Sequence, residues 1–100
     1  MAETLTPAER DALAETLPRW RPLPDRDAVA QDWRFGSFNA AWGFLCRVAL
    51  LAERHGHHPE ITNVYGRVSL VLSTHDAGGL TGRDVALARA IDALGPARPG

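Results

Sequence analysis

Apolar and polar residues alternate along several short stretches of the chain, and this period of two is typical of a strand with one buried face. In residues 68–75, the apolar residues Val, Leu and Leu share one side with Thr74. Residues 28–35 alternate in a similar way, and shorter apolar stretches occur at 20–23 and 61–65. We therefore expect four strands, in which the first two and the last two form hairpins.

Residues 37–55 carry apolar side chains at the spacing of a helix, with Ser37 as a candidate N-cap and Gly56 as a natural stop. The apolar positions form a wide stripe: Phe38, Trp42, Phe44, Leu45, Val48, Ala49, Leu51 and Ala52. We expect so broad a stripe to be buried on more than one side, with part of it meeting another subunit.

Capping patterns predict two further helices. Thr6 and Glu9 have the spacing of a capping box at the start of a helix that stops at Pro18. Thr81 and Asp84 have the same spacing and begin the last helix, where the Asp84 charge also favours the positive end of the helix dipole.

The order of the expected elements is α-β-β-α-β-β-α. This order predicts an α+β domain of two layers, in which a four-stranded antiparallel sheet carries three helices on one face. A chain of 100 residues makes one domain over 1–100. We expect its core to span about 5–94 and its last residues, 95–100, to form a frayed tail.

Composition narrows the possible partners and the cellular compartment. The formal net charge is −1, and nucleic-acid binders usually carry a basic stripe instead. No apolar run approaches the roughly 18 residues of a membrane span, and the first residues lack the features of a secretory signal. The single Cys46 cannot form an internal disulfide. We therefore expect a cytoplasmic protein with no membrane partner and no direct nucleic-acid partner.

All four histidines lie between residues 53 and 84. His57 and His58 follow the end of the long predicted helix, and His75 ends a predicted strand. Imidazole exchanges protons near neutral pH, so histidines on two sides of a substrate can act as acid and base. Glu53 precedes His57 by four residues, and from the last helical turn it could orient an imidazole.

Other interpretations of these residues stay open at this level. The His-His-Pro segment is equally typical of a solvated turn, and His57, His58 and His75 could in principle supply three zinc ligands. Adjacent residues rarely aim at one ion, however. Tyr65 suits a packing aromatic, and Cys46 suits an inert core position.

The spacing of the polar residues carries a more specific resemblance. The pattern is an acidic residue, His-His-Pro, an aromatic residue, His and Asp, separated in turn by three, five, nine and eight positions. It is matched by Glu53, His57, His58, Pro59, Tyr65, His75 and Asp84. With the flanking sequence, this pattern resembles the pterin-4a-carbinolamine dehydratase family, also called 4a-hydroxytetrahydrobiopterin dehydratases. The resemblance covers about residues 5–94.

The resemblance implies a lyase that dehydrates 4a-hydroxytetrahydrobiopterin to quinonoid dihydropterin without a metal or other cofactor. His57, His58 and His75 would be the catalytic set, with His57 and His75 as the acid/base pair and His58 chiefly binding the pterin. The implied substrate-binding residues are Glu53, Ser73, Thr74 and Asp76, and the implied supporting residues are Pro59, Tyr65 and Asp84.

The same resemblance implies partners. The reaction recycles tetrahydrobiopterin, the cofactor of aromatic amino-acid hydroxylases, and members of the family form homodimers or homotetramers. The family is also similar to a dimerisation cofactor of a homeodomain transcription factor and to helpers of enzyme assembly. The alternative to the enzyme is therefore a non-catalytic interaction module on the same fold.

Overall fold

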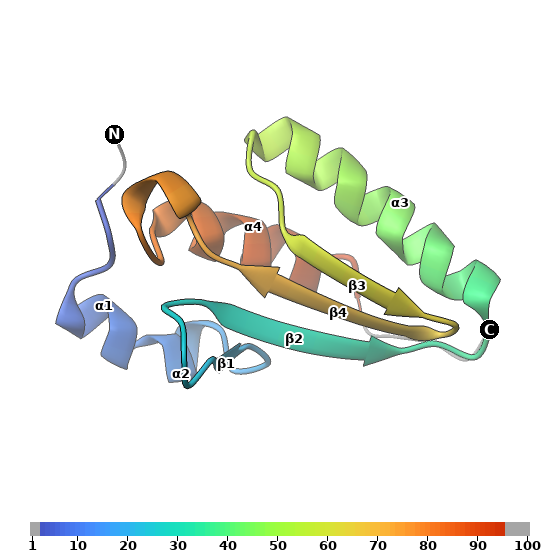
Figure 1. Cartoon of the computed structure of the whole chain (residues 1–100), viewed down its shortest axis with the longest axis horizontal. Helices are drawn as coiled ribbons and strands as arrows, with labels where there is room; N and C mark the ends of the chain where they lie inside the picture. Colours follow the sequence, from blue (N-terminus) through green and yellow to red (C-terminus); the bar gives the residue numbers. More distant parts are fainter. Residues whose placement is uncertain (1–2, 96–100) are drawn as a thin grey trace.

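The computed structural model describes residues 3–95, and four antiparallel strands form its sheet (Figure 1). The strands are β1 (Arg21–Pro22), β2 (Val29–Arg34), β3 (Glu60–Val64) and β4 (Arg67–Leu72). They lie in the order β1-β2-β4-β3, so the two predicted hairpins meet through β2 and β4. The α+β class and the four-stranded antiparallel sheet are thus confirmed.

The helices are α1 (Pro7–Asp11), α2 (Leu13–Thr16), α3 (Phe38–His55) and α4 (Gly82–Asp92), and the short 3-10 helix η1 spans His75–Ala77. Figure 1 shows α3 and α4 on one side of the sheet. The first predicted helix is split at Ala12 into α1 and α2. No residue of α1 is buried, whereas α2 begins with the buried Leu13.

The predicted capping signals all occur in the structure. Thr6 and Glu9 form a complete capping box, as do Thr81 and Asp84, and the Ser37 hydroxyl accepts the backbone N–H of Ala40. Each cap joins two residues that are only three positions apart, so it depends on the local sequence and not on the tertiary fold.

The sheet buries the face that the alternation of β4 predicted. Val68, Leu70 and Leu72 are at most 1% exposed, and β2 contributes Val29 and Trp33 to the same face. The core is completed by the helices and the N-terminal segment: Leu5, Leu13, Leu17, Trp20, Ala41, Phe44, Leu45, Val48, Leu80, Leu87, Ala88 and Ile91. Both layers therefore contribute to one apolar core, the dominant favourable term in folding.

The strand predicted over 68–75 is too long, because β4 ends at Leu72. Thr74 instead forms an isolated bridge with Gly79, in which each residue's N–H donates to the other's carbonyl at 3.0 and 3.2 Å. This bridge closes a tight loop, so His75 begins η1 instead of extending the sheet.

The apolar stripe of α3 divides between two environments. Phe44, Leu45 and Val48 are buried, whereas Phe38 is 53% and Trp42 48% exposed. Cys46 is exposed, so its expected core position is wrong. Within residues 3–95, no helix combines the length and the hydropathy that crossing a membrane requires.

Tyr65 and Gly66 form the turn between β3 and β4. Tyr65, and not Gly66, takes the left-handed backbone conformation, with φ +53°, and its side chain is 81% exposed instead of packed. Gly66 is needed for a different reason. A Cβ at this position would lie 2.4 Å from the carbonyl oxygen of Phe35, so the backbones of two segments approach too closely for a side chain.

We predict that Gly66→Ala lowers the free energy of unfolding by about 1–3 kcal/mol, because Phe35 cannot give way without a backbone shift. Urea denaturation of both proteins measures the difference. Gly43→Ala, in α3 with nothing within 4 Å of the added Cβ, is the control. It should gain about 0.5–1 kcal/mol. A Gly66→Ala protein as stable as wild type would contradict the steric argument.

Candidate functional site

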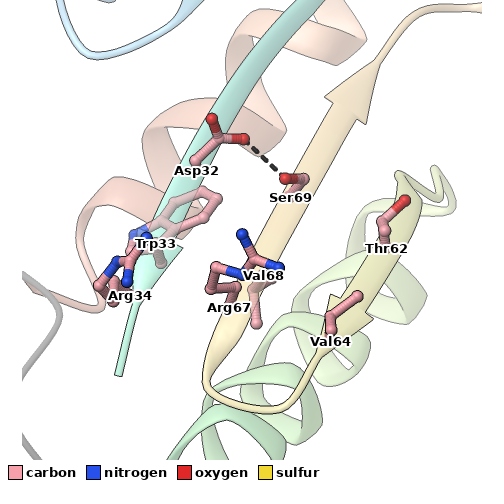
Figure 2. A pocket seen from close by; sticks show the side chains of 8 residues that line it. All are labelled: Asp32, Trp33, Arg34, Thr62, Val64, Arg67, Val68 and Ser69. Carbon is pink, nitrogen blue, oxygen red and sulfur yellow. Dashed lines mark hydrogen bonds between the residues drawn. The ribbon is translucent and has the colours of Figure 1, made fainter. Parts of the chain in front are cut away.

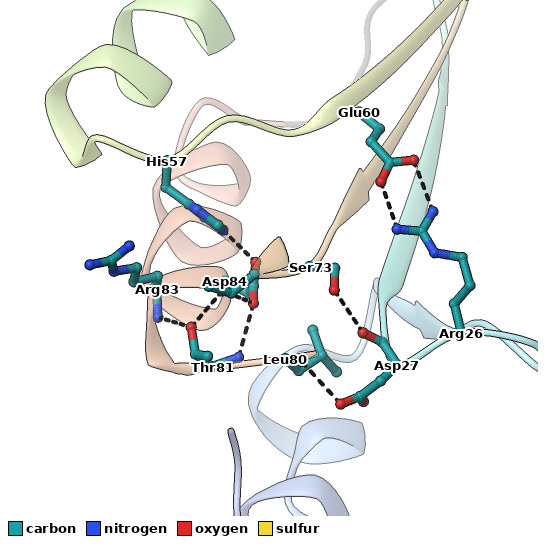
Figure 3. A network of polar contacts seen from close by, with 10 residues as sticks. Arg26, Asp27, His57, Glu60, Ser73, Leu80, Thr81, Arg83 and Asp84 are labelled. Carbon is teal, nitrogen blue, oxygen red and sulfur yellow. Dashed lines mark hydrogen bonds and ion pairs between the residues drawn. The ribbon is translucent and has the colours of Figure 1, made fainter. Parts of the chain in front are cut away.

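A buried carboxylate lies at the centre of the polar residues that the sequence singled out. Asp84 is fully buried at the start of α4. Its Oδ2 accepts the backbone N–H of Thr81 at 2.9 Å (Figure 3). The same oxygen accepts the hydroxyl of Thr74 at 2.8 Å. The hydroxyls of Thr74 and Thr81 lie 2.6 Å apart. Thus the loop after β4 is joined to the first turn of α4.

The other oxygen of this carboxylate contacts an imidazole from a third segment. His57 Nε2 lies 2.5 Å from Asp84 Oδ1, and His57 is only 8% exposed. Gly56 ends α3 in a left-handed conformation with φ +60°, and the N–H of His57 then donates to the carbonyl of Ala52. The Asp84 carboxylate, held by two further donors, thus fixes the orientation of the His57 ring.

The second histidine of the pair points elsewhere. His58 Nε2 lies 2.7 Å from Glu53 Oε2, and these side chains are 65% and 77% exposed. From the residues alone, Glu53 was expected to orient an imidazole. The structure gives it His58 as its partner, because the turn at Gly56 directs His57 inward toward Asp84.

A second carboxylate holds the other side of the loop after β4. Asp27 accepts the N–H of Leu80 at 3.1 Å and pairs with Arg10, while its backbone carbonyl accepts the Ser73 hydroxyl at 2.9 Å. A Cβ on Gly79 would lie 2.1 Å from Asp27 Oδ2. The segment is therefore fixed between Asp84 and Asp27 (Figure 3).

A hollow of about 250 Å³ opens between the end of α3 and this loop. Its lining consists of Gly56, His57, His58, Ser73, Thr74, His75, Asp76 and Arg83. The three histidines predicted to be catalytic thus border one hollow, together with three of the four predicted substrate-binding residues. Asp84 lies behind its wall, in contact with His57.

Besides Asp84, three predicted residues do not line the hollow. Glu53 reaches it only through His58, and Pro59 is partly buried in the connection to β3. Tyr65 lies in the β3–β4 turn, at the opposite end of β4 from Ser73 (Figure 1). Thr74 lines the hollow, and its hydroxyl donates to Asp84.

Two residues of this region were not predicted from the sequence. Arg83 lines the hollow from the first turn of α4, and its place one residue before Asp84 was the available signal. The other is Asp27, and no local pattern indicated its contacts with Leu80 and Ser73. Those contacts join residues more than forty positions apart.

The arrangement is suited to proton transfer. His57 has a fixed orientation and a negative partner, whereas His75 is exposed on the other side of the same hollow. Two imidazoles that border one hollow can serve as proton donor and proton acceptor to the same ligand. Within residues 3–95, no three His, Cys, Asp or Glu side chains are grouped to hold a metal ion.

A larger hollow, of about 390 Å³, lies elsewhere on the sheet and lacks this chemistry. Figure 2 shows it over β2, β3 and β4, with Asp32, Ser69 and Arg67 among its lining residues. The Ser69 hydroxyl donates to Asp32 at 2.7 Å, and this bond lowers the pKa of the Asp32 carboxyl. The hollow contains no imidazole, so we assign the candidate site to the histidines.

Comparison with known proteins gives one consistent family. The family model for pterin 4 alpha carbinolamine dehydratase matches residues 3–94. Relatives named "Putative pterin-4-alpha-carbinolamine dehydratase" include one from Burkholderia cenocepacia (strain HI2424), 52% identical over 100% of this chain and 99% of its own length. Another, from Rhodopseudomonas palustris (strain BisB18), is 51% identical over 94% of this chain and 93% of its own length.

Solved structures agree on the fold. A transcriptional coactivator/pterin dehydratase from Brucella melitensis has a TM-score of 0.86 and 36% identity, covering 92% of this chain and 98% of its own. A pterin dehydratase-like protein, identified as a RuBisCO assembly factor in the alpha-carboxysome, has a TM-score of 0.66 and 26% identity, covering 82% and 95%. The matched proteins thus include roles other than catalysis.

The Asp27 contacts predict a pH-dependent stability. The hydrogen bond from Arg10 holds the pKa of the Asp27 carboxyl below its ordinary value, against the opposing effect of partial burial. A carboxyl whose pKa is lower in the folded than in the unfolded protein stabilises the fold. The stabilisation is fully present when the pH is above the unfolded-state pKa of about 4, and it disappears as the pH falls through the folded-state pKa. Wild type should therefore be more stable than Asp27→Asn near neutral pH, and the gap should shrink below about pH 4.

Thermal unfolding of both proteins between about pH 6 and pH 3 measures this gap. Asp25→Asn, at an exposed neighbouring carboxylate, is the matched control and should follow wild type throughout. A gap between wild type and Asp27→Asn that stays constant over this range would contradict the prediction.

Proposed function

Because the chain belongs to the pterin 4 alpha carbinolamine dehydratase family, we propose that it removes water from 4a-hydroxytetrahydrobiopterin to give quinonoid dihydropterin. The observation that carries this proposal is the buried His57–Asp84 pair, which borders the same hollow as His75. A protein that served only as a scaffold would not need a buried ion pair beside two further histidines.

The proposed reaction begins at the 4a-hydroxyl of the substrate. The His57 imidazolium donates a proton to this hydroxyl, the C4a–O bond breaks, and water leaves. The proton on N5 passes to His75 or to solvent, and the electron pair of the N5–H bond forms the C4a–N5 double bond. Asp84 stabilises the imidazolium before the transfer and holds its ring in place.

The remaining residues have binding roles in this proposal. His58 and Glu53 form an exposed pair at the rim, where their polar atoms can contact the pterin ring. Ser73, Thr74 and Asp76 line the same hollow and supply further polar groups for the ring edge. No cofactor is required, since each step moves only protons and one hydroxyl.

We further propose that the protein acts in the cytoplasm, where it recycles the tetrahydrobiopterin used by aromatic amino-acid hydroxylases. The single, exposed Cys46 suits a reducing compartment. The product of the reaction, a dihydropterin, must be reduced before the next hydroxylation, so an electron donor acts after this step.

We predict that His57→Ala lowers the turnover of the carbinolamine by about two to four orders of magnitude, because the proposed general acid is removed. The double variant His57→Ala/His75→Ala should retain no acceleration over the uncatalysed reaction. The carbinolamine is generated in situ, and its decay is followed by absorbance.

His55→Ala is the matched control, since His55 is exposed in the last turn of α3 and does not line the hollow. It should leave turnover unchanged. Circular dichroism establishes that each variant is folded. Wild-type turnover in a folded His57→Ala protein would remove His57 from the role of general acid.

A second candidate function rests on the exposed apolar surface of α3. Phe38, Trp42 and Leu50 are 53%, 48% and 70% exposed, which is typical of a surface that binds another protein. We propose that this surface joins copies of the chain into a dimer or a tetramer. The alternative is a non-catalytic module whose α3 surface binds a transcription factor or an enzyme under assembly.

We predict that Trp42→Glu/Leu50→Glu shifts the chain to a smaller oligomer or a monomer, because burying two carboxylates at an apolar contact is unfavourable. Sedimentation equilibrium measures the mass. Ala14→Glu places the same charge at an exposed position of α2 and should leave the mass unchanged. An unchanged mass for the double variant would exclude α3 as the contact. A macromolecular complex that survives His75→Ala would favour the non-catalytic module.

A further inference from the structure

A second hollow lies on the other side of His75. Its volume is about 270 Å³, and it is lined by Arg26, Asp27, Ser73, His75, Gly78 and Gly79. Ser73 and His75 also line the hollow that contains His57. The two hollows are therefore adjacent, and His75 borders both.

The sizes of the two hollows indicate that they work together. Pockets for small molecules usually measure roughly 300–1,000 Å³. Neither hollow reaches this range alone, at about 250 and 270 Å³, whereas the two volumes together fall within it. A ligand whose ring occupies the first hollow thus has room to extend past His75.

The second hollow has an ion pair at its edge. Arg26 donates through Nη1 and Nη2 to the two carboxylate oxygens of Glu60, at 2.9 and 2.6 Å (Figure 3). This bond lowers the pKa of the Glu60 carboxyl. Arg26 lines the same hollow as His75, so the pair lies beside the candidate site.

The chemistry of this pair favours a neutral, hydroxylated ligand. A guanidinium has five N–H donors, and the bonds to Glu60 use only two of them. Because the two opposite charges cancel, the pair attracts neither a phosphate nor an ammonium strongly, but its free N–H groups and oxygen lone pairs can bind hydroxyls.

The other residues that line the second hollow leave room for a ligand, and few of their polar groups would compete for its hydroxyls. Both oxygens of the Asp27 carboxylate already have partners, in Arg10 and the Leu80 N–H. The glycines at 78 and 79 present no side chain, and Gly78 adopts φ +78°. The Ser73 hydroxyl donates to the Asp27 carbonyl, which leaves its oxygen free to accept. The lining thus offers donors from Arg26 and an acceptor from Ser73, and the Glu60 oxygens lie within 2.9 Å of the Arg26 guanidinium.

We propose that this second hollow is a specificity site, in which Arg26 and Glu60 bind the hydroxylated side chain of the reduced pterin while the ring lies against His57. This inference rests on the proposed function, and it adds a role for residues outside the histidine cluster. Arg26 then determines which carbinolamine is bound, and the histidines determine how fast the bound one reacts.

The test compares two carbinolamines in wild type and Arg26→Ala. One carries the dihydroxypropyl group of tetrahydrobiopterin at C6, and the other carries a methyl group. Arg26→Ala should raise KM for the first by about tenfold, since more than one hydrogen bond is lost. Its kcat should stay within about twofold, and both constants for the methyl substrate should be unchanged. Equal effects on the two substrates, or no effect on either, would overturn the proposal.

Arg34→Ala is the matched control, because Arg34 is an exposed arginine on the same sheet and lies outside both hollows. It should leave both constants at wild-type values for both substrates. A purely structural effect of losing an arginine would instead change the constants for the methyl substrate as well.

A binding experiment separates failure of this inference from failure of the proposed function. Calorimetry gives the dissociation constants of 7,8-dihydrobiopterin and 6-methyl-7,8-dihydropterin, neither of which can be dehydrated. Wild type should bind the former about tenfold more tightly, and Arg26→Ala should abolish the difference. Equal affinities in wild type overturn the specificity site even if the enzyme is active. A clear preference without turnover supports the site and rejects the dehydratase.

Discussion

The buried carboxylate of Asp84 is the interaction on which the site and much of the fold depend. An ionised group inside a protein must be paired and hydrogen-bonded, because its lost hydration is otherwise uncompensated. Asp84 meets this requirement with donors from the loop after β4, from the start of α4 and from the segment after α3. The contacts that make burial of the charge tolerable are therefore the same contacts that bring His57 to the hollow.

The parts of this arrangement that sequence predicted are local. The Thr81–Asp84 capping box, the Gly56 stop and the alternation in β4 each depend on residues a few positions apart, and all occur in the structure. The spacing of the histidines indicated a common site through family resemblance. Contacts of Asp27 with Leu80 and Ser73 were not predictable, because they depend on how β2 and β4 are placed in the sheet.

Periodicity also cannot say what covers an apolar face. The stripe on α3 was correctly identified, yet Phe44 and Val48 pack on the sheet while Trp42 remains half exposed. A helix face that packs within the chain and one that packs against another protein have the same pattern of residues. Sequence also does not show why the turn after β3 needs a glycine. Gly66 is required because the backbone of Phe35 lies too close for a side chain, whereas the positive φ belongs to Tyr65.

The pairing of β2 with β4 has a consequence for how the protein folds. Val29 pairs with Leu72 and Arg34 with Arg67, so the central ladder closes only after the whole of α3 and β3 has been synthesised and brought alongside. Domains with such distant pairings have high contact order and fold more slowly than helical bundles of similar size. The loop that carries His75 follows β4 directly, so a partly folded chain holds no assembled cleft. The hollow that His57 and His75 line is therefore complete only after the last helix has docked, because Asp84 at the start of α4 contacts His57.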